Sequence, residues 1–572
     1  MAMVEQLYLP EECWECIFKI FLDKCCDHNG YLQSLSVVSK QFLSITDRCK
    51  SSLTLFNQTL PFLLRLFQRF TNLTSLDLRH FKGNCNVLLT DISRFQLQLK
   101  SLNLSNHYFI PVDGLRVFSQ QITTLTSLIC SNIISIRKSD FFLIADCFPF
   151  LEELDLSFPG YSSFNVNSEI DVISLALPKL RKVNFSGNNY INDSSLFYLC
   201  KNCEFLEEIV MFNCMHLTQF GIASAIRERP YLRSLSFYTG LPNMELIDSL
   251  RSLKCLSDLN LSYSYISNQL LSSLADEGLS LRRLVLRRCR GSGYPAILYL
   301  LSKSRFLQHL DLENLRYLND HDVAELSEYL LSLVSINLSH CTKLTQSTLH
   351  ALVEKCPFLD EIRMEDTRIG KLVVEKNCSS FRDSVVNPRI KMKSLHLAYN
   401  PYLNNETIKL FASIFPNLQL LDVNNCSCIS DEGIVEVLRC CKIVHLNLSS
   451  CRKVNLLGLN FQVPTLEVLN LSLTRIDDKT PDAISKSCSG LLQLDLKGCH
   501  HVTDKGVKQV IGKCTRLKEI NVLGCRKVSS NVDFWTAMEL SRPSLRNILP
   551  PSDFRPSNSK WKPLLGGGCF RC

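Results

Sequence analysis

The sequence has no long apolar run and only a thin excess of positive charge. No segment approaches the roughly 18 consecutive apolar residues of a membrane-spanning helix. The opening residues, MAMVEQLYLPEECWEC, carry acidic side chains where a signal peptide has basic ones. Lys plus Arg exceed Asp plus Glu by only 63 to 55, which is unlike a nucleic-acid binder. We therefore expect a soluble protein of the nucleus or cytoplasm, without a membrane span and without a nucleic-acid partner.

The sequence also lacks the common signatures of catalytic sites. It contains no GxxxxGK[ST], HExxH or GxSxG segment. Cys13 and Cys16 have the C-x-x-C spacing of zinc ligands, but no second ligand pair or histidine cluster lies nearby. These absences predict a protein with no catalytic residues, no metal and no cofactor of its own, which leaves any chemistry to its partners.

What the sequence contains in quantity is a repeat. The pattern apolar-x-x-apolar-x-apolar occurs eighteen times between LTSLDL at Leu73 and LKEINV at Leu517. The mean spacing is about 26 residues, within the range of the leucine-rich repeat. Each unit predicts a short strand, then a turn with a helix N-cap such as Ser430 or Thr503, then a helix packed behind the strand. Stacked units predict an α/β solenoid with a parallel sheet inside and helices outside.

The abundant cysteines, 27 in all, follow the repeat. Seven stand three residues after the last apolar residue of a strand: Cys214, Cys289, Cys341, Cys426, Cys451, Cys499 and Cys525. Six more lie near the predicted helix end: Cys147, Cys203, Cys356, Cys440, Cys488 and Cys514. Such positions predict buried thiols that pack as small apolar side chains with a weak donor, in place of disulfides or metal ligands.

Six Asn-x-Ser sequons fall inside the strand-like segments. Glycans there would cover the surface that the strands form, so we expect these sequons to be unmodified. Their asparagines are Asn103, Asn184, Asn260, Asn337, Asn447 and Asn470.

Residues 9–45 predict a small helical module with one apolar face, and Pro10 suits the opening turn of its first helix. From composition alone, this module is compatible with a cap on the open end of the solenoid. The order of its residues, however, resembles the F-box, in Leu9-Pro10, Glu12, Ile17-Phe18, Leu35, Val38-Ser39-Lys40 and Phe42. The sequence departs from that pattern at Cys13, where an aliphatic residue is usual, and at Phe42, where many members have Trp.

The strands and their cysteine positions are similar to the cysteine-containing class of leucine-rich repeats, which commonly follows an F-box. The similarity to plant F-box/leucine-rich-repeat proteins is greatest around SVVSKQFLSITDRCKSSLTL. The resemblance implies binding to a Skp-type adaptor, and through it to a cullin and a RING protein in an SCF-type ubiquitin ligase. It also implies which residues contact the adaptor: Leu9, Pro10, Ile17, Phe18, Val38 and Phe42.

This interpretation divides the chain into four parts. They are an F-box at residues 1–50, a packed apolar bridge at 51–72, about eighteen leucine-rich repeats at 73–540 and a tail at 541–572. The repeats would bind the target protein. Two alternatives stay open: a hormone-type co-receptor, since such F-box proteins share the arrangement and hold a small ligand above an inositol phosphate, and an interaction scaffold outside any ligase.

The concave face of the predicted sheet carries a candidate anion site. Its basic residues are Lys182, Arg283, Arg287 and Arg363. The strands of Arg283 and Arg363 should lie about 14 Å apart, and arginine suits carboxylate and phosphate groups. An acidic or phosphorylated target segment, or an inositol phosphate, would fit there. The competing interpretation is that nearby acids pair with these residues as ordinary surface charge: Asp258, Asp311, Glu313, Glu361 and Glu365.

Two further segments are unusual. The interval from Leu359 to Met392 is the longest between repeats, and such insertions in solenoids often lie on a binding face; a tolerated surface excursion is the alternative. The final Cys569-Phe-Arg-Cys572 has the spacing of a prenylation box, although Arg571 stands where an aliphatic residue is expected. A flexible or capping tail is the alternative there.

Overall fold

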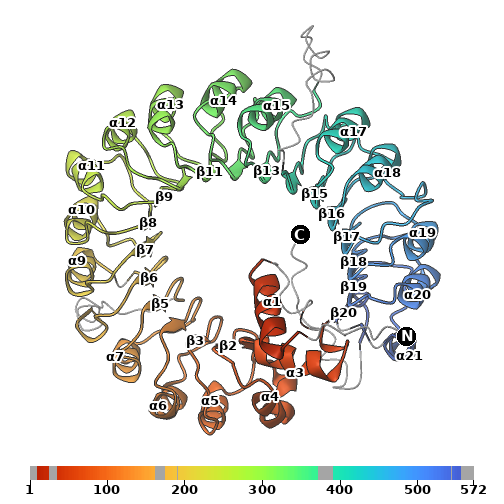
Figure 1. The fold of residues 1–572 in the computed structure, drawn as a ribbon, viewed down its shortest axis with the longest axis horizontal. Coiled ribbons are helices and arrows are strands. Elements are labelled where there is room, and N and C mark those ends of the chain that lie inside the picture. Colours follow the sequence, from red (N-terminus) through yellow and green to blue (C-terminus); the bar gives the residue numbers. More distant parts are fainter. Residues whose placement is uncertain are drawn as a thin grey trace, which may run out of the picture. The chain divides into compact units, whose positions relative to one another are not determined.

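The computed structural model describes residues 9–24, 32, 35–160, 174–189, 191–371, 391–542, 544–545 and 547–555. The chain forms two compact units. Unit 1 comprises Met1–Tyr238 and Pro242–Leu256, and unit 2 comprises Thr239–Leu241 and Ser257–Cys572. In each unit parallel strands lie along one side and helices along the other (Figure 1).

Unit 1 begins with a helical module and continues with parallel strands that pair in sequence order. Its strands are β1 (Ser52–Thr54), β2 (Ser75–Asp77), β3 (Ser101–Asn103), β4 (Ser127–Ile129), β5 (Glu153–Asp155), β6 (Lys182–Asn184), β7 (Glu208–Met211) and β8 (Ser234–Phe237). Its helices are α1 (Glu11–Lys24), α3 (Lys40–Cys49), the 3-10 helix η1 (Asn57–Phe62), α4 (Leu63–Arg69), α5 (Cys85–Ser93), α6 (Val112–Gln121), α7 (Lys138–Cys147), α9 (Asp193–Asn202), α10 (Gln219–Arg227) and α11 (Met244–Arg251).

Unit 2 continues the same alternation of strand and helix, again with parallel pairing in sequence order. Its strands are β9 (Asp258–Asn260), β10 (Arg283–Val285), β11 (His309–Asp311), β12 (Ser335–Asn337), β13 (Glu361–Arg363), β14 (Ser394–His396), β15 (Leu420–Asp422), β16 (His445–Asn447), β17 (Val468–Asn470), β18 (Gln493–Asp495), β19 (Glu519–Asn521) and β20 (Asn547–Leu549). Its helices are α12 (Asn268–Asp276), α13 (Tyr294–Lys303), α14 (Asp320–Ser327), α15 (Gln346–Lys355), α17 (Asn405–Ile414), α18 (Asp431–Cys440), α19 (Lys479–Ser487), α20 (Asp504–Lys513) and α21 (Val532–Ser541).

All eighteen predicted strands are present, as β2 through β19, and each begins two residues after the first apolar residue of its pattern. The structure adds β1 and β20, which pair with β2 and β19. The pattern missed both because Lys50 and Pro550 replace one of its three apolar residues. Residues 51–72 are therefore not a separate bridge, since β1, η1 and α4 form a further repeat. The repeats likewise continue past residue 540 to β20.

A polar ladder follows the third position of the strands. The Asp or Asn there accepts a hydrogen bond from the backbone N–H two residues later, as Asp311 does from Glu313 at 2.9 Å and Asn337 from Ser339 at 3.1 Å. All six sequon asparagines make this turn bond with the Ser of the sequon. The Asn-x-Ser sequences thus serve the turn after each strand, where a short amide mimics a backbone acceptor.

At the strand ends the prediction of buried thiols is confirmed for six of the seven cysteines, and the seventh, Cys214, is half-buried. All seven predicted thiols lie near a carbonyl oxygen of the preceding repeat, at Sγ to O distances between 2.9 and 3.4 Å. At the helix ends the prediction is wrong for Cys440, which is exposed, whereas Cys441 is buried at the helix C-cap. Cys147 is also only half-buried, because the buried residue after its helix is Phe148.

The predicted helix caps are present with one difference. Thr503 accepts the N–H of Lys505, as expected for an N-cap. Ser430 stands at the N-cap of α18, but its hydroxyl accepts a hydrogen bond from Asn405 of the preceding helix instead of capping its own helix. Between β16 and β17, the described residues contain no helix. This interval is the shortest of all, 23 residues, which leaves little chain for one.

Candidate functional site

The N-terminal module has its own aromatic core, which holds α1 against α3. Phe18 is 2% exposed, and its ring centroid lies 5.1 Å from that of Phe42. Trp14 packs on Phe42 at 4.9 Å, and Ile17 is partly buried against the same cluster. Phe18 was predicted to contact the adaptor, but its side chain is inside the module and not on the surface. Phe42 and Ile17 also contribute mainly to this core.

The other predicted adaptor residues are on the surface. Leu9 is 42% exposed and Val38 is 63% exposed, and Pro10 is exposed beside Leu9. Val37, at 83%, and Ile20, at 54%, are further exposed apolar residues of this module that the sequence interpretation missed. Val37 is next to Val38, so the pair of apolar residues just before α3 was the sequence signal that could have identified Val37.

Ion pairs fasten the two helices to each other. The Arg48 guanidinium lies 2.9 Å from the Glu11 carboxylate and 3.3 Å from that of Glu15. The pKa of Glu15 is lowered chiefly by its hydrogen bond from Lys19. One residue earlier in α3, Asp47 pairs with Arg69 of α4 at 2.8 Å. The module and the first repeat are therefore joined by an ion pair.

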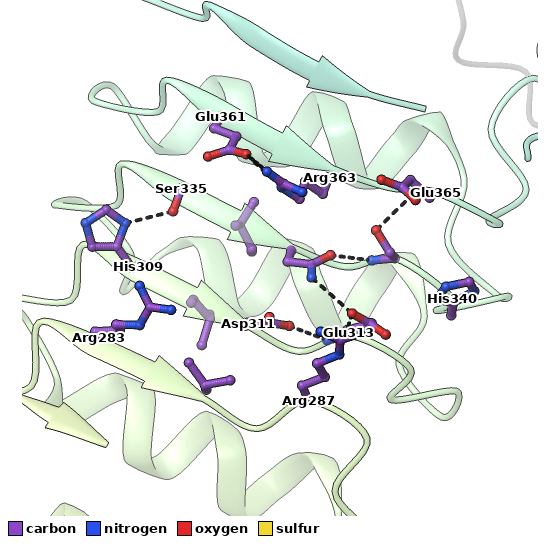
Figure 2. Close-up of a pocket in the computed structure, with 15 residues that line it drawn as sticks. Arg283, Arg287, His309, Asp311, Glu313, Ser335, His340, Glu361, Arg363 and Glu365 are labelled. Atoms are coloured by element: carbon purple, nitrogen blue, oxygen red, sulfur yellow. Dashed lines mark hydrogen bonds and ion pairs between the residues drawn. The ribbon is translucent and has the colours of Figure 1, made fainter. Parts of the chain in front are cut away.

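The sheet of unit 2 carries a hollow of about 490 Å³ over β10 to β13. Figure 2 shows charged side chains along it, with Arg283 and His309 at one end and Glu365 and His340 at the other. Three of the four predicted anion-binding residues, Arg283, Arg287 and Arg363, line this hollow. The fourth, Lys182, belongs to β6 of unit 1 and lies 3.7 Å from Glu208 of β7.

Strand register arranges the lining residues in rows. Arg283, His309, Ser335 and Glu361 form one row, because they are register partners at the first position of their strands. The next outward row runs through Val285, Asp311, Asn337 and Arg363. A third row follows two residues beyond the strands and contains Arg287, Glu313, Ser339 and Glu365.

Two of the three arginines are already paired within the protein. The Nε atom of Arg287 lies 2.7 Å from the buried Glu313 carboxylate, although its N–H is not directed at the oxygen. Arg288 approaches the same carboxylate at 3.2 Å. Arg363 pairs with Glu361 at 2.7 Å through both Nε and a terminal nitrogen. For these residues the structure favours the interpretation as internal charge pairs.

Two charged side chains of the hollow stay without such a partner. Arg283 is exposed, and its guanidinium makes no hydrogen bond or ion pair with any residue that the structure describes. The Glu365 carboxylate likewise has no such partner among the described residues, and burial, reinforced by Asp422, raises its pKa. Beside Arg283, His309 contacts the Ser335 hydroxyl through Nδ1 at 2.8 Å.

Other predicted features carry less information. In the part of the chain that the structure describes, no helix is long and apolar enough to cross a membrane, and no three His, Cys, Asp or Glu side chains cluster as metal ligands. Most of the long interval around Cys378, and the tail with Cys569, lie outside the described residues.

Comparisons with known proteins agree with the repeat. A family model of the leucine-rich repeat matches residues 176–200. F-box/LRR-repeat protein 4 of Bos taurus is 22% identical over 224 residues, which cover 38% of this chain and 36% of that protein. DNA repair protein rhp7 of Schizosaccharomyces pombe is 25% identical over 201 residues, 35% of this chain and 31% of that protein. The chain thus spans about a third of the length of these curated relatives.

Among solved structures, the crystal structure of the Rad7 and Elc1 complex in yeast aligns at a TM-score of 0.37 and 16% identity, over 87% of this chain and 91% of that chain. The parallel strands, the helices behind them and the matching family model define this protein as a leucine-rich-repeat solenoid. Its sequence is similar to that of an F-box/LRR-repeat protein.

Proposed function

We propose that this chain is the target-binding subunit of an SCF-type ubiquitin ligase. In this proposal the N-terminal module binds a Skp-type adaptor, which brings a cullin and a RING protein, and the repeats bind the target protein. The observation that carries the proposal is the exposure of Leu9, Val37 and Val38 on a module whose own core is already filled. Exposed apolar residues of this kind mark a surface for a partner protein.

Within this proposal, the predicted adaptor residues divide into two groups. Leu9, Pro10 and Val38 contact the adaptor directly, while Phe18 and Phe42 hold the helices that present them. The chain supplies binding and orientation only, and transfer of ubiquitin occurs on its partners, without a cofactor bound to this chain. A place of action in the nucleus or cytoplasm suits this role.

The test is association of the purified full chain with a purified Skp-type adaptor. Val38→Glu should weaken binding at least about tenfold, because a charge would be buried against the adaptor. Val87 of α5 is a matched control: it is 56% exposed, so Val87→Glu makes the same change on a repeat helix and should leave binding unchanged.

A deletion separates the ligase proposal from its alternatives. Removal of residues 1–50 leaves β1 intact and should abolish adaptor binding while the repeats stay folded. Adaptor binding that survives this deletion would overturn the proposal, whereas a full chain that does not bind the adaptor at all would favour the interaction scaffold.

The hormone co-receptor is the less favoured alternative. Small-molecule pockets are mostly apolar with a few polar groups, whereas the hollow of unit 2 is lined mainly by charged and polar side chains. Such a lining is better matched to a segment of a polar polypeptide. Thermal stabilisation of the chain by a small apolar ligand would reverse this preference.

A further inference from the structure

Some charged side chains of the hollow have partners within the protein and others do not, and the ones without partners indicate which ligand the hollow can bind. Glu313 and Glu361 take up Arg287 and Arg363. The carboxylate of Asp311 accepts the N–H of Glu313 in the turn after β11. Among the lining residues that the structure describes, the cation Arg283 and the carboxylate Glu365 therefore stand out, because their side chains make neither a hydrogen bond nor an ion pair. They lie at opposite ends of the hollow (Figure 2).

We propose that this hollow binds an extended segment of the target protein that carries one acidic and one basic side chain, with the acidic one on Arg283 and the basic one on Glu365. The inference rests on the proposed function, because it names the segment that the repeats would bind. His309 adds to the acid-binding end, since it is the register partner of Arg283 on β11.

Strand geometry sets the spacing of the two charges. Arg283 and Glu365 are separated by three strand steps and by four residues along the strand direction, which places their Cα atoms about 19 Å apart on strand spacings of 4.8 and 3.3 Å. An extended segment advances about 3.3 Å per residue. The side chains of Arg283 and Glu365 and those of the two target residues span part of this distance. The acidic and basic residues of the target should therefore stand about four to six positions apart.

A polyphosphate fits the same hollow poorly. Its lining contains four carboxylates, those of Asp311, Glu313, Glu361 and Glu365, against three arginines. A densely charged anion would gain Arg283 but would also face these acids. A segment with one charge of each sign meets only the unpaired groups.

The rim above the hollow gives a second, independent observation. Two or three residues past the end of most strands, the chain has a residue with a positive φ angle. Outside β9 to β14 this residue is mostly Asn or Gly, namely Asn106, Asn132, Gly187, Asn213, Asn425, Gly498 and Gly524, with Phe158, Ser450 and Leu473 as the exceptions. Over β9 to β14 only Asn314 is of this type among the described positions, and the others are Tyr263, Arg288, His340, Asp366 and Tyr399.

Large side chains are strained in this conformation, so their retention calls for a role. Tyr263 and Tyr399 are 51% and 50% exposed, which excludes core packing as that role. They follow β9 and β14, the strands on either side of those that line the hollow. Strain of this kind gathers at binding sites. In the proposal, the two rings contact the target residues on either side of the charged pair.

The test uses random twelve-residue peptides displayed on phage, selected on the purified complex of the full chain with its adaptor. Wild type should enrich peptides with an acidic and a basic residue four to six positions apart. Arg283→Glu should replace the acidic preference by a basic one, and Glu365→Lys should make the reverse exchange. Each variant should bind a synthetic wild-type peptide at least about tenfold more weakly.

Matched controls make the same charge changes on the helix side. Arg305→Glu and Glu354→Lys alter exposed residues and should select the same peptides as wild type. Identical peptides on all five proteins, or no charge pattern on wild type, would overturn the inference. It would also be overturned if inositol hexakisphosphate bound the wild type and lost binding in Arg283→Ala.

Adaptor binding is measured in parallel on each variant, to separate this inference from the proposed function. Adaptor binding that persists while the peptide pattern fails would overturn the inference alone. Failure of the adaptor to bind wild type overturns the proposed function, and the selection, repeated on the chain alone, still reads the peptide preference of the hollow.

Discussion

The Sγ atom of Cys451 lies 3.1 Å from the carbonyl oxygen of Val423, which follows the corresponding strand of the preceding repeat. The same position holds Thr474 in the next repeat, where the hydroxyl donates to the Leu471 carbonyl. The site thus accepts a small side chain with a donor. The residue at this position therefore need not be Cys in every repeat, provided that its side chain can donate a hydrogen bond in the turn after the strand.

Cys451→Val and Cys451→Thr test this donor with side chains of one shape. We expect the Thr variant to be more stable than the Val variant by about 0.5–1.5 kcal/mol, because only Thr can donate to a carbonyl there. Denaturant unfolding of the full chain measures the difference. If the site only required an apolar side chain, the Val variant would be the more stable of the two.

Burial should also protect these thiols from alkylation. Burial raises the pKa of Cys451 to about 11 and those of Cys341 and Cys525 to about 12, so little reactive thiolate forms at pH 8. We expect iodoacetamide to label the exposed Cys13, Cys255 and Cys428 well before them. Peptide mass spectrometry of the native chain reads the order, and early labelling of Cys341 would contradict the assigned burial.

Asp422→Asn should stabilise the chain at neutral pH. Burial raises the pKa of Asp422, so its charged form costs stability above that raised pKa and the cost fades as the pH falls below it. Asn can accept the same N–H of Asn424, as Asn447 does at the register position of β16. Unfolding at pH 7 and at pH 4 should show a gain that shrinks with acid. An equal gain in stability at both pH values would mean that the gain does not come from removing the charge of Asp422.

His396 should make the protein sensitive to acid. Burial lowers the pKa of His396 to about 4, below the value of about 6.5 for an unfolded histidine. Between these values the unfolded chain binds a proton that the folded chain does not, so stability falls as the pH drops from about 6.5 to about 4. His396→Gln should reduce this slope by up to about 1.4 kcal/mol per pH unit, whereas His321→Gln, at an exposed position of α14, should not.

Much of the fold follows from local pattern. The alternation of apolar residues specified β2 to β19, and the same spacing located the seven cysteines that meet a carbonyl of the preceding repeat. The pattern failed where a residue of another kind stands at one of its apolar positions. Lys50 is such a residue before β1, and Pro550 is such a residue after β20. Cys440 and Cys441 show the limit in a helix, since one residue of phase decides which thiol is buried.

The candidate sites depended on contacts that spacing does not contain. The strand register brought Arg283, Arg287 and Arg363 to one hollow, as their periodic positions indicate. Which of them stays available was decided by the partners, Glu313 and Glu361, that the tertiary structure places against the other two. Likewise the order of residues marked Phe18 for the adaptor, whereas packing of α1 on α3 encloses its ring. Periodicity is a property of one strand or helix, but ion pairing and burial are settled between elements, by side chains that compete for the same neighbours.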